Sequence, residues 1–203
     1  MAGPADGIID LYSRRADDWD ADRGRSLIER PWLDAFLAQV PAHGRVLDLG
    51  CGSGEPIAGY LVRQGRRVTG VDAAPGLIDL CRARFPDQDW RVADMRGLDL
   101  GRTFDGVIAW HSAFHLTPGD QRGLFSVHAR HVAPGGALMF TSGSTADESV
   151  GEWRGEPLYH ASLSPEAYRA ALDESGFDLI DHRIDDAACG GATVWLSRRR
   201  VRE

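Results

Sequence analysis

From residue 45 onward, short apolar runs alternate with stretches of helical length, and this alternation constrains the fold more than any other feature. The apolar runs predict strands over residues 45–49, 66–72, 90–94, 104–110 and 137–142. The stretches between them predict helices over residues 55–65, 74–85 and 118–132. Strands that alternate with helices at this spacing form parallel sheets covered by helices on both faces. Right-handed crossovers then give a doubly wound α/β sheet whose ligand cleft lies at the carboxyl ends of its strands.

The pattern changes at both ends of the chain. A helix is predicted over residues 164–177, and the strands predicted over 178–184 and 192–198 have no helix between them, which indicates an antiparallel hairpin at one sheet edge. Residues 8–40 have a helical period and mixed charge, so we expect them to cover the mouth of the sheet. The expected organisation is one domain with four parts: an N-terminal helical cap (1–40), a cofactor-binding core (41–143), a substrate loop (144–163) and a C-terminal helix and hairpin (164–203).

Composition excludes several classes of protein. A chain of 203 residues suits one domain, and its net charge of −7 argues against a nucleic-acid groove, which needs a basic surface. The three cysteines are odd in number and form no C-x-x-C pair, so we predict neither a disulfide framework nor a zinc ribbon. The first residues lack a signal-peptide pattern, and no apolar run approaches the roughly 18 residues of a membrane span. We therefore expect a cytoplasmic protein with no nucleic-acid or membrane partner.

The stretch VLDLGCGSGEP carries the first specific chemistry. Its glycines, Gly50, Gly52 and Gly54, lie where the first predicted strand turns into the first helix, and glycine there permits positive φ and close approach of a ligand. The free N–H groups at the start of that helix favour an anionic ligand group. The dinucleotide pattern G-x-G-x-x-G fails in both possible frames, because Glu55 and Ile57 occupy the third glycine's place.

Two acidic residues flank this glycine loop. Asp48 lies on the strand before it, where a carboxylate suits a ligand with a sulfonium or ammonium group. Asp72 ends the second predicted strand, 22 positions after Gly50, where a carboxylate can bind both ribose hydroxyls of an adenosine. The loop and its two acids together indicate a nucleoside cofactor that carries positive charge.

At this point the chain resembles the class I S-adenosylmethionine-dependent methyltransferases, over about residues 8–198. The matching motifs are VLDLGCGSG (46–54), VTGVDAAPGLIDLCRARF (68–85), RVADMRGL (91–98), FDGVIAWHSAFHL (104–116) and HVAPGGALMFT (131–141). The resemblance implies a Rossmann-like sheet of about seven strands, mostly parallel with an antiparallel C-terminal strand. It also implies S-adenosylmethionine as the cofactor, S-adenosylhomocysteine as the product and no metal.

The resemblance implies cofactor contacts by position. These are Gly50, Cys51 and Gly52 along the methionine moiety, Asp48 near its ammonium group, Asp72 on the ribose hydroxyls with Ala73 beside them, Asp94 and Met95 at the adenine, Trp110 against the cofactor, and Tyr12 and Trp19 in a helix that closes over it.

The stretch AWHSAFHL places two histidines, His111 and His115, four positions apart. Such a pair can ligate metal from one helical turn, but this stretch leaves a strand and contains no further metal ligand, and Ser112 stands where a metalloprotease has glutamate. A neutral histidine can instead remove a proton from a methyl acceptor. His111 directly follows Trp110 and is the stronger candidate for that base. For His115 two interpretations stay open: it lines the pocket, or it packs under the loop.

The segment after the fifth predicted strand, within residues 151–163, is dense in aromatic and ionisable side chains. We expect Trp153, Arg154 and Glu156 to line the acceptor pocket, with Arg154 able to hold an acidic acceptor. Tyr159 and His160 could orient or deprotonate the acceptor. The alternative is a lid ordered by its own aromatic side chains.

The resulting hypothesis is methyl transfer from S-adenosylmethionine to an oxygen or nitrogen atom of a small molecule, by a monomer or a homodimer. A nucleic-acid methylase is disfavoured, because the fourth strand ends in AWHS rather than the Asn/Asp-Pro-Pro-aromatic motif and the chain is acidic. Two other classes stay open: a cofactor-binding protein without turnover that acts through a partner, and an NAD(P)-dependent reductase.

Overall fold

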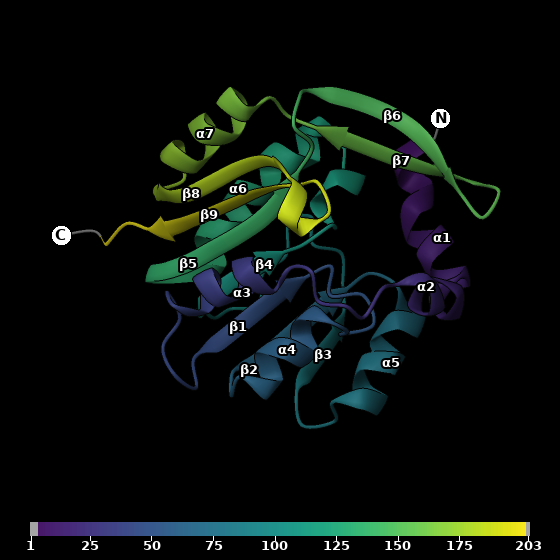
Figure 1. Ribbon diagram of the computed structural model, residues 1–203, viewed down its shortest axis with the longest axis horizontal. Helices are drawn as coiled ribbons and strands as arrows, with labels where there is room; N and C mark the ends of the chain where they lie inside the picture. The colour runs from purple at the N-terminus through teal and green to yellow at the C-terminus, as the bar shows by residue number, and fades with distance from the viewer. Residues whose placement is uncertain (1–3, 202–203) are drawn as a thin grey trace.

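A β-sheet with helices on both faces forms the centre of the computed structural model, which describes residues 4–201 (Figure 1). Within that range the sheet has seven strands in the order β3-β2-β1-β4-β5-β9-β8. Their bounds are β1 Arg45–Leu49, β2 Arg67–Asp72, β3 Asp89–Val92, β4 Phe104–Ala109, β5 Val132–Ser142, β8 Phe177–Asp186 and β9 Ala192–Arg199. The first five pair in parallel, whereas β9 runs antiparallel to both of its neighbours. The predicted doubly wound sheet with an antiparallel C-terminal strand is confirmed.

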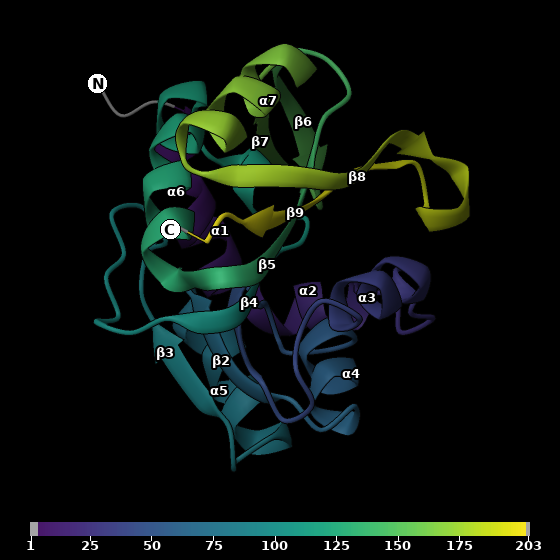
Figure 2. The same ribbon diagram turned by 90° about the vertical axis from the view of Figure 1, so that its left-hand side faces the viewer.

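Helices cover the sheet on both sides, as Figure 2 shows with α6 on one side and α3 and α4 on the other. The α-helices are α1 Ile8–Arg14, α2 Ala16–Asp22, α3 Arg30–Leu37, α4 Ile57–Arg63, α5 Pro75–Arg84, α6 Pro118–His131 and α7 Pro165–Glu174, and the short 3-10 helices are η1 Pro4–Gly7, η2 Ala113–His115 and η3 Ala187–Cys189. Apolar side chains of α3, α4 and α5 form one core with the sheet, and those of α6 and α7 form the other. Neighbouring residues of a strand serve opposite cores, as Val107 and Ile108 do, which explains why the strands read as continuous apolar runs.

The local signals for helix ends correspond to hydrogen bonds in the structure. The Ser164 hydroxyl accepts the backbone N–H of Ala167 at the start of α7, and Gly176 has a left-handed backbone just after this helix. The fifth strand is longer than predicted, because the chain through Pro134 already belongs to β5, with an irregularity in its pairing to β4.

The segment predicted as a substrate loop, 144–163, is a β-hairpin outside the central sheet. Its strands are β6 Asp147–Trp153 and β7 Glu156–Ser162, paired antiparallel. Arg154 and Gly155 form the two-residue connection, both with positive φ (52° and 80°), as a hairpin turn that follows the strand twist requires. An arginine is an uncommon first residue for such a turn, so the usual Asn-Gly or Asp-Gly signal was absent from the sequence.

The N-terminal helices divide between two locations, which corrects the expectation that residues 1–40 form one cap. Figure 1 shows α1 and α2 beside the hairpin, at the carboxyl end of the parallel strands. In contrast, α3 packs its buried Trp32, Leu33 and Phe36 into the core on one face of the sheet. The apolar stripe of α3 explains the difference, because burial of three large side chains favours a sheet face over a cavity mouth. Residues 1–3 and 202–203 of the expected domain lie outside the described range.

No helix in residues 4–201 has the length and apolar character required to cross a membrane.

Candidate functional site

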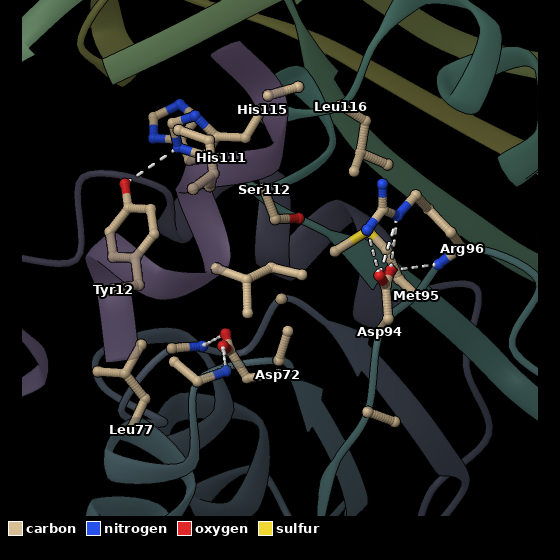
Figure 3. A pocket seen from close by; sticks show the side chains of 18 of the residues that line it. Tyr12, Asp72, Leu77, Asp94, Met95, Arg96, His111, Ser112, His115 and Leu116 are labelled. Atoms are coloured by element: carbon tan, nitrogen blue, oxygen red, sulfur yellow. Dashed lines mark hydrogen bonds and ion pairs between the residues drawn. The ribbon is translucent and has the colours of Figure 1, made fainter. Parts of the chain in front are cut away.

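A cavity of about 820 Å³, counted with its open mouth, lies at the carboxyl ends of the central strands beneath α1 and α2 (Figure 3). Its wall is made by Ala5, Ile8, Ile9, Tyr12, Trp19, Gly50, Gly52, Asp72, Ala73, Ala74, Leu77, Ala93, Asp94, Met95, Arg96, His111, Ser112, His115, Leu116 and Asp120. Eight of the predicted cofactor residues therefore share one cavity, and the two predicted histidines of AWHSAFHL join them. They come together because the carboxyl ends of parallel strands meet at one edge of a sheet.

Close packing makes glycine necessary in the cofactor loop. A Cβ atom on Gly50 would lie 2.2 Å from the Cβ of Ser112, and one on Gly52 would lie 2.6 Å from the ring of Trp19. Both residues also have positive φ, at 74° and 55°. The loop thus brings bare backbone to the cavity wall. Gly54, by contrast, faces Cys81, so it supports the loop from behind.

Asp72 lies in the cavity wall with Ala73, at the end of β2. Its carboxylate accepts hydrogen bonds from the backbone N–H groups of Gly52 and Ala74, each at 2.9 Å. Burial raises the pKa of Asp72, although these backbone bonds oppose the shift. The bonds hold the carboxylate beside the glycine loop.

Asp48 and Cys51 are buried behind the loop, outside the described cavity wall. Burial, followed by the nearby charge of Asp72, raises the pKa of Asp48 to about 7. Asp48 therefore keeps its proton up to about pH 7, so the carboxylate of Asp72 is the group that favours a cation in the cavity. Cys51 instead fills the room left by Gly70 of β2, where a Cβ would lie 2.9 Å from its sulfur.

The segment after β3 supplies a second polar stretch of the wall. Asp94 holds the Arg96 guanidinium through two bonds, to Nε at 2.9 Å and Nη2 at 2.6 Å. Burial acts in the opposite direction, but Arg96 keeps the pKa of Asp94 below its usual range. Arg96 also lies 3.8 Å from Asp120, so its charge is already matched by acids.

His111 presents a free imidazole to the cavity. Its backbone is left-handed (φ 48°) and its N–H donates to the Thr141 hydroxyl at 2.8 Å, which fixes the turn after β4. The side chain is exposed toward the cavity, and neither ring nitrogen has a hydrogen-bond partner among residues 4–201. Although its surface is open to the cavity, the walls around it shield His111 from bulk water, and this desolvation, followed by the charge of Arg23, lowers the pKa of His111 to about 4.

The ring of His115, in contrast, is bonded on both sides. Nδ1 lies 2.8 Å from the backbone carbonyl of Tyr159, and Nε2 lies 3.0 Å from the hydroxyl of Tyr12. Burial is the main cause that lowers the pKa of His115 to about 4, so the ring is neutral at neutral pH. The two histidines therefore differ: the ring nitrogens of His111 have no hydrogen-bond partner in residues 4–201, whereas both ring nitrogens of His115 are hydrogen-bonded.

Tyr159 and His160 lie on β7, outside the described cavity wall. The Tyr159 hydroxyl donates to Glu148 at 2.6 Å, so the side chain binds its own hairpin and only its carbonyl reaches His115. The His160 ring packs 4.9 Å from that of His115 and 5.2 Å from that of Phe114, measured between centroids. Neither side chain lies in the described cavity wall, so the structure gives no support to the predicted roles of Tyr159 and His160 in orienting or deprotonating the acceptor.

The three predicted acceptor residues of the hairpin bind the N-terminal helices instead of the cavity. Arg154 forms ion pairs with Asp18 and Asp22, and the Trp153 indole N–H donates to Asp22 at 3.1 Å. Glu156 pairs with Arg14 at 2.7 Å and with Arg15 at 2.9 Å. The residues that form these ion pairs between the hairpin and the N-terminal helices are called the clasp: Arg14, Arg15, Asp18, Asp22, Arg154 and Glu156. The expectation that Arg154 holds an acidic acceptor is corrected, because acids on α2 already satisfy its charge.

The prediction that Trp110 lies against the cofactor is also corrected, because Trp110 is not part of the described cavity wall. The side chain is buried in the core that α3 and α4 share with the sheet. Residues of even number on β4 face that core, as Ile108 does, and Trp110 continues the same alternation beyond the strand end. The strand period therefore decides its direction.

The structure adds wall residues that the sequence had not indicated. They are Ala5, Ile8, Ile9, Leu77, Ala74, Ala93, Arg96, Ser112, Leu116 and Asp120. Ser112 had a usable signal, since it directly follows His111 at the end of a central strand. The apolar residues of η1 and α1 had none, because only the tertiary position of that helix turns them toward the cavity.

Within residues 4–201, no group of three or more histidine, cysteine, aspartate or glutamate side chains is arranged to hold a metal ion.

Known proteins share this sequence pattern. The family model described as a methyltransferase domain matches residues 46–136. The dTDP-4-amino-2,3,4,6-tetradeoxy-D-glucose N,N-dimethyltransferase of Saccharopolyspora spinosa is 27% identical over 131 residues, covering 64% of this chain, which spans 50% of that protein's length. A ubiquinone biosynthesis O-methyltransferase of Rhizobium leguminosarum bv. trifolii is 30% identical over a 212-residue alignment that covers 86% of this chain and 82% of that protein.

Known structures share the fold. The 1,6-didemethyltoxoflavin-N1-methyltransferase of Burkholderia thailandensis, solved with 1,6-didemethyltoxoflavin and S-adenosylhomocysteine bound, has a TM-score of 0.75 to this chain. The match covers 99% of this chain and 92% of that one at 18% sequence identity.

Proposed function

Because this chain belongs to the S-adenosylmethionine-dependent methyltransferases, we propose that it transfers the methyl group of S-adenosylmethionine to an oxygen or nitrogen atom of a small molecule. The observation that carries this proposal is one cavity that joins the bare glycine loop and Asp72 to the unpartnered imidazole of His111. Its two ends have different chemistry, one for a charged nucleoside and one for a polar acceptor.

The residues present fit the cofactor. Gly50 and Gly52 present backbone to the cavity, since a Cβ on either would collide with Ser112 or Trp19, and Asp72 offers acceptors for two hydroxyl groups. The carboxylate of Asp72 also favours positive charge in the cavity. When bound, S-adenosylmethionine supplies a methyl group on a sulfonium centre, and it leaves as the thioether S-adenosylhomocysteine.

His111 would receive the proton that the acceptor loses. The new carbon bond forms from the lone pair of the acceptor's oxygen or nitrogen, which makes the attached hydrogen strongly acidic. A neutral imidazole can accept that proton even with a pKa near 4, and its exposure toward the cavity lets it pass the proton to water. The rest of the wall aligns the two reactants and excludes water.

We further propose that the acceptor is uncharged or cationic at the reacting end. In the described part of the wall, Arg96 is the one cationic side chain, and Asp94 and Asp120 already neutralise it. Arg154, the other candidate for binding a carboxylate, is held in the clasp. A carboxylate acceptor would therefore face Asp72, Asp94 and Asp120 without a free counter-charge.

Two measurements test the proposed function. Calorimetric titration should show binding of S-adenosylmethionine and none of NAD(H), and the reverse result would favour the reductase alternative. A screen for S-adenosylhomocysteine release should then compare amines, phenols and N-heterocycles with matched analogues that carry a carboxylate beside the reacting atom. We expect release only with the members that lack the carboxylate. Cofactor binding without release from any acceptor would support a binding protein that acts through a partner.

We also propose that the enzyme works in a reducing cytoplasm as a monomer or homodimer. Support for the compartment comes from Cys51, Cys81 and Cys189, which are all buried free thiols.

A further inference from the structure

The helices α1 and α2, which cover the cavity, are called the lid. We infer that His115 is a positioning residue that holds α1 of this lid over the cavity by accepting a hydrogen bond from Tyr12. The inference rests on the proposed function for its cofactor measurement, whereas its measurement of lid opening is independent of that function. His115 therefore takes no direct part in proton transfer, although it lies four residues from His111.

The bonds of His115 determine its tautomer. A carbonyl oxygen can only accept, so the contact of Nδ1 with the Tyr159 carbonyl, at 2.8 Å, requires the hydrogen to be on Nδ1. In a neutral ring Nε2 is then a bare acceptor, and the Tyr12 hydroxyl, 3.0 Å away, must be the donor. The Tyr159 carbonyl thus sets the direction of both hydrogen bonds, the one from His115 to the hairpin and the one from Tyr12 to His115.

Both groups keep these protonation states at neutral pH. Burial, and next the charge of Asp72, raise the pKa of Tyr12 to about 12, so its hydroxyl retains the proton that it donates. Burial lowers the pKa of His115 to about 4, and the neighbouring rings of His160 and His111 act in the same direction. A second proton on His115 would turn Nε2 into a donor and reverse the bond, so that the Tyr12 hydroxyl would accept it.

Tyr12 is placed to transmit this bond to the cavity. Its ring lies 5.5 Å from that of His115 and stacks on Trp153 at 6.0 Å, and Figure 3 shows its hydroxyl directed toward the two histidines at the cavity wall. Trp19, which covers Gly52, contacts the Tyr12 ring edge-on, with 6.2 Å between the ring centroids. One hydrogen bond therefore connects the turn after β4 to the two lid aromatics nearest the cofactor loop.

The clasp cannot provide the same positional control. Its ion pairs join side chains that are about a quarter to a half exposed, such as Arg154 and Asp22 at 41% and 44%, and exposed pairs contribute little to stability. His115 as a residue is only 9% exposed, so its hydrogen bonds meet little competition from water. The clasp brings the hairpin and lid together, and His115 sets where Tyr12 rests.

The test is a double-mutant cycle with Tyr12→Phe and His115→Asn. Asparagine places an amide N–H where Nδ1 was, so it keeps the bond to Tyr159 but offers nothing to Tyr12. We expect each single variant to weaken S-adenosylmethionine binding about 3- to 10-fold, the effect of one lost hydrogen bond. Each should also speed hydrogen exchange of the Ile8–Arg14 amides in the free protein. The double variant should bind S-adenosylmethionine no more weakly than the single variant with the lower affinity, because both substitutions remove the same hydrogen bond.

Tyr60→Phe is the matched control, since it removes a hydroxyl that binds Asp34 at a distance from the lid. We expect it to leave lid exchange and cofactor affinity unchanged. Once an acceptor is known, KM for S-adenosylmethionine should rise in His115→Asn while kcat at saturating cofactor stays unchanged.

Additive effects in the double variant, or unchanged lid exchange in Tyr12→Phe, would overturn the inference. A loss of kcat at saturating cofactor in His115→Asn would also overturn it, by showing that the ring acts on the reacting atoms. If the wild-type protein did not bind S-adenosylmethionine, the proposed function would fail, and the exchange data would still decide the role of His115.

Discussion

Two histidines four residues apart have different environments because their ring nitrogens have different partners. His115 is bonded to Tyr159 and Tyr12, whereas His111 turns an unpartnered ring into the cavity. Sequence spacing suggested a pair, but His111 has a left-handed backbone in the turn after β4, whereas His115 lies in the short helix η2 that follows. A ring with free nitrogens can receive a proton, and a ring with both nitrogens bonded is suited to hold another group in place.

Replacing His111 with asparagine should therefore slow turnover without loosening the cofactor. General acid–base groups contribute at least about 100-fold, so we expect kcat to fall by that order while the affinity for S-adenosylmethionine stays close to wild type. Steady-state kinetics and calorimetry on the same preparation would check this. Full kcat in His111→Asn would show that water or the acceptor itself disposes of the proton.

Replacing Asp72 with alanine should weaken S-adenosylmethionine binding by about 1–3 kcal/mol, because charge-assisted hydrogen bonds to the ribose would be lost. The same change leaves the N–H groups of Gly52 and Ala74 without their acceptor, so the melting temperature should be measured alongside. Unchanged calorimetric affinity would contradict the assignment of Asp72 to the ribose.

Asp48 should make the stability of the free protein depend on pH. The unfolded carboxyl loses its proton near the ordinary value of 3.8, whereas the folded one keeps it to about pH 7. Between these values the unfolded chain binds fewer protons, so the free energy of unfolding falls as pH rises, by up to about 1.4 kcal/mol per pH unit.

Asp48→Asn removes this term, and urea unfolding of both proteins from pH 4.5 to 8 would check it. We expect the stability of the wild type relative to Asp48→Asn to decrease up to about pH 7 and then level off. A difference that does not change with pH would contradict the buried, protonated carboxyl.

At the scale of elements, the hairpin and the lid act together. Charged residues on α1 and α2 and at the tip of the hairpin pair across more than 130 positions of sequence, as Arg154 does with Asp18 and Asp22. The sequence alone predicts that the hairpin residues line a pocket, because it shows their charges but not the residues with which they form ion pairs. The hairpin is thus a support for the lid, and the described cavity wall contains none of its residues.

Arg154→Ala should loosen the lid mainly at low salt. The variant loses three hydrogen bonds to acids on α2, so exchange of the α2 amides should rise, and high salt should bring the wild type toward the variant by screening the same pairs. Arg122→Ala, on an exposed turn of α6, is the control that should not change lid exchange. Equal salt dependence in Arg154→Ala and wild type would show that the clasp does not hold the lid.

For the whole molecule, cofactor affinity should appear as thermal stability. The cavity wall is built from the lid, the glycine loop and the segments after β2, β3 and β4, so a ligand there connects parts of the chain that separate on unfolding. S-adenosylhomocysteine at 100 times its Kd should add about 2.7 kcal/mol to the free energy of unfolding, whereas NADH should add nothing. Differential scanning calorimetry would measure both, and stabilisation by NADH would contradict the cofactor assignment.

The sequence by itself determined the sheet, its mostly parallel order and the cofactor end of the cavity. Buried strands show as apolar runs whatever their neighbours, and the glycines and Asp72 are fixed by local backbone geometry at strand ends, so both signals are readable one segment at a time. Only the tertiary structure decided the acceptor end. Whether Arg154 binds a substrate or Asp22, whether Trp110 faces the cavity or the core, and whether His115 is free or bonded to Tyr12 depend on segments distant in sequence. Charges and ring nitrogens take the partners that folding brings to them, and that choice has no local pattern.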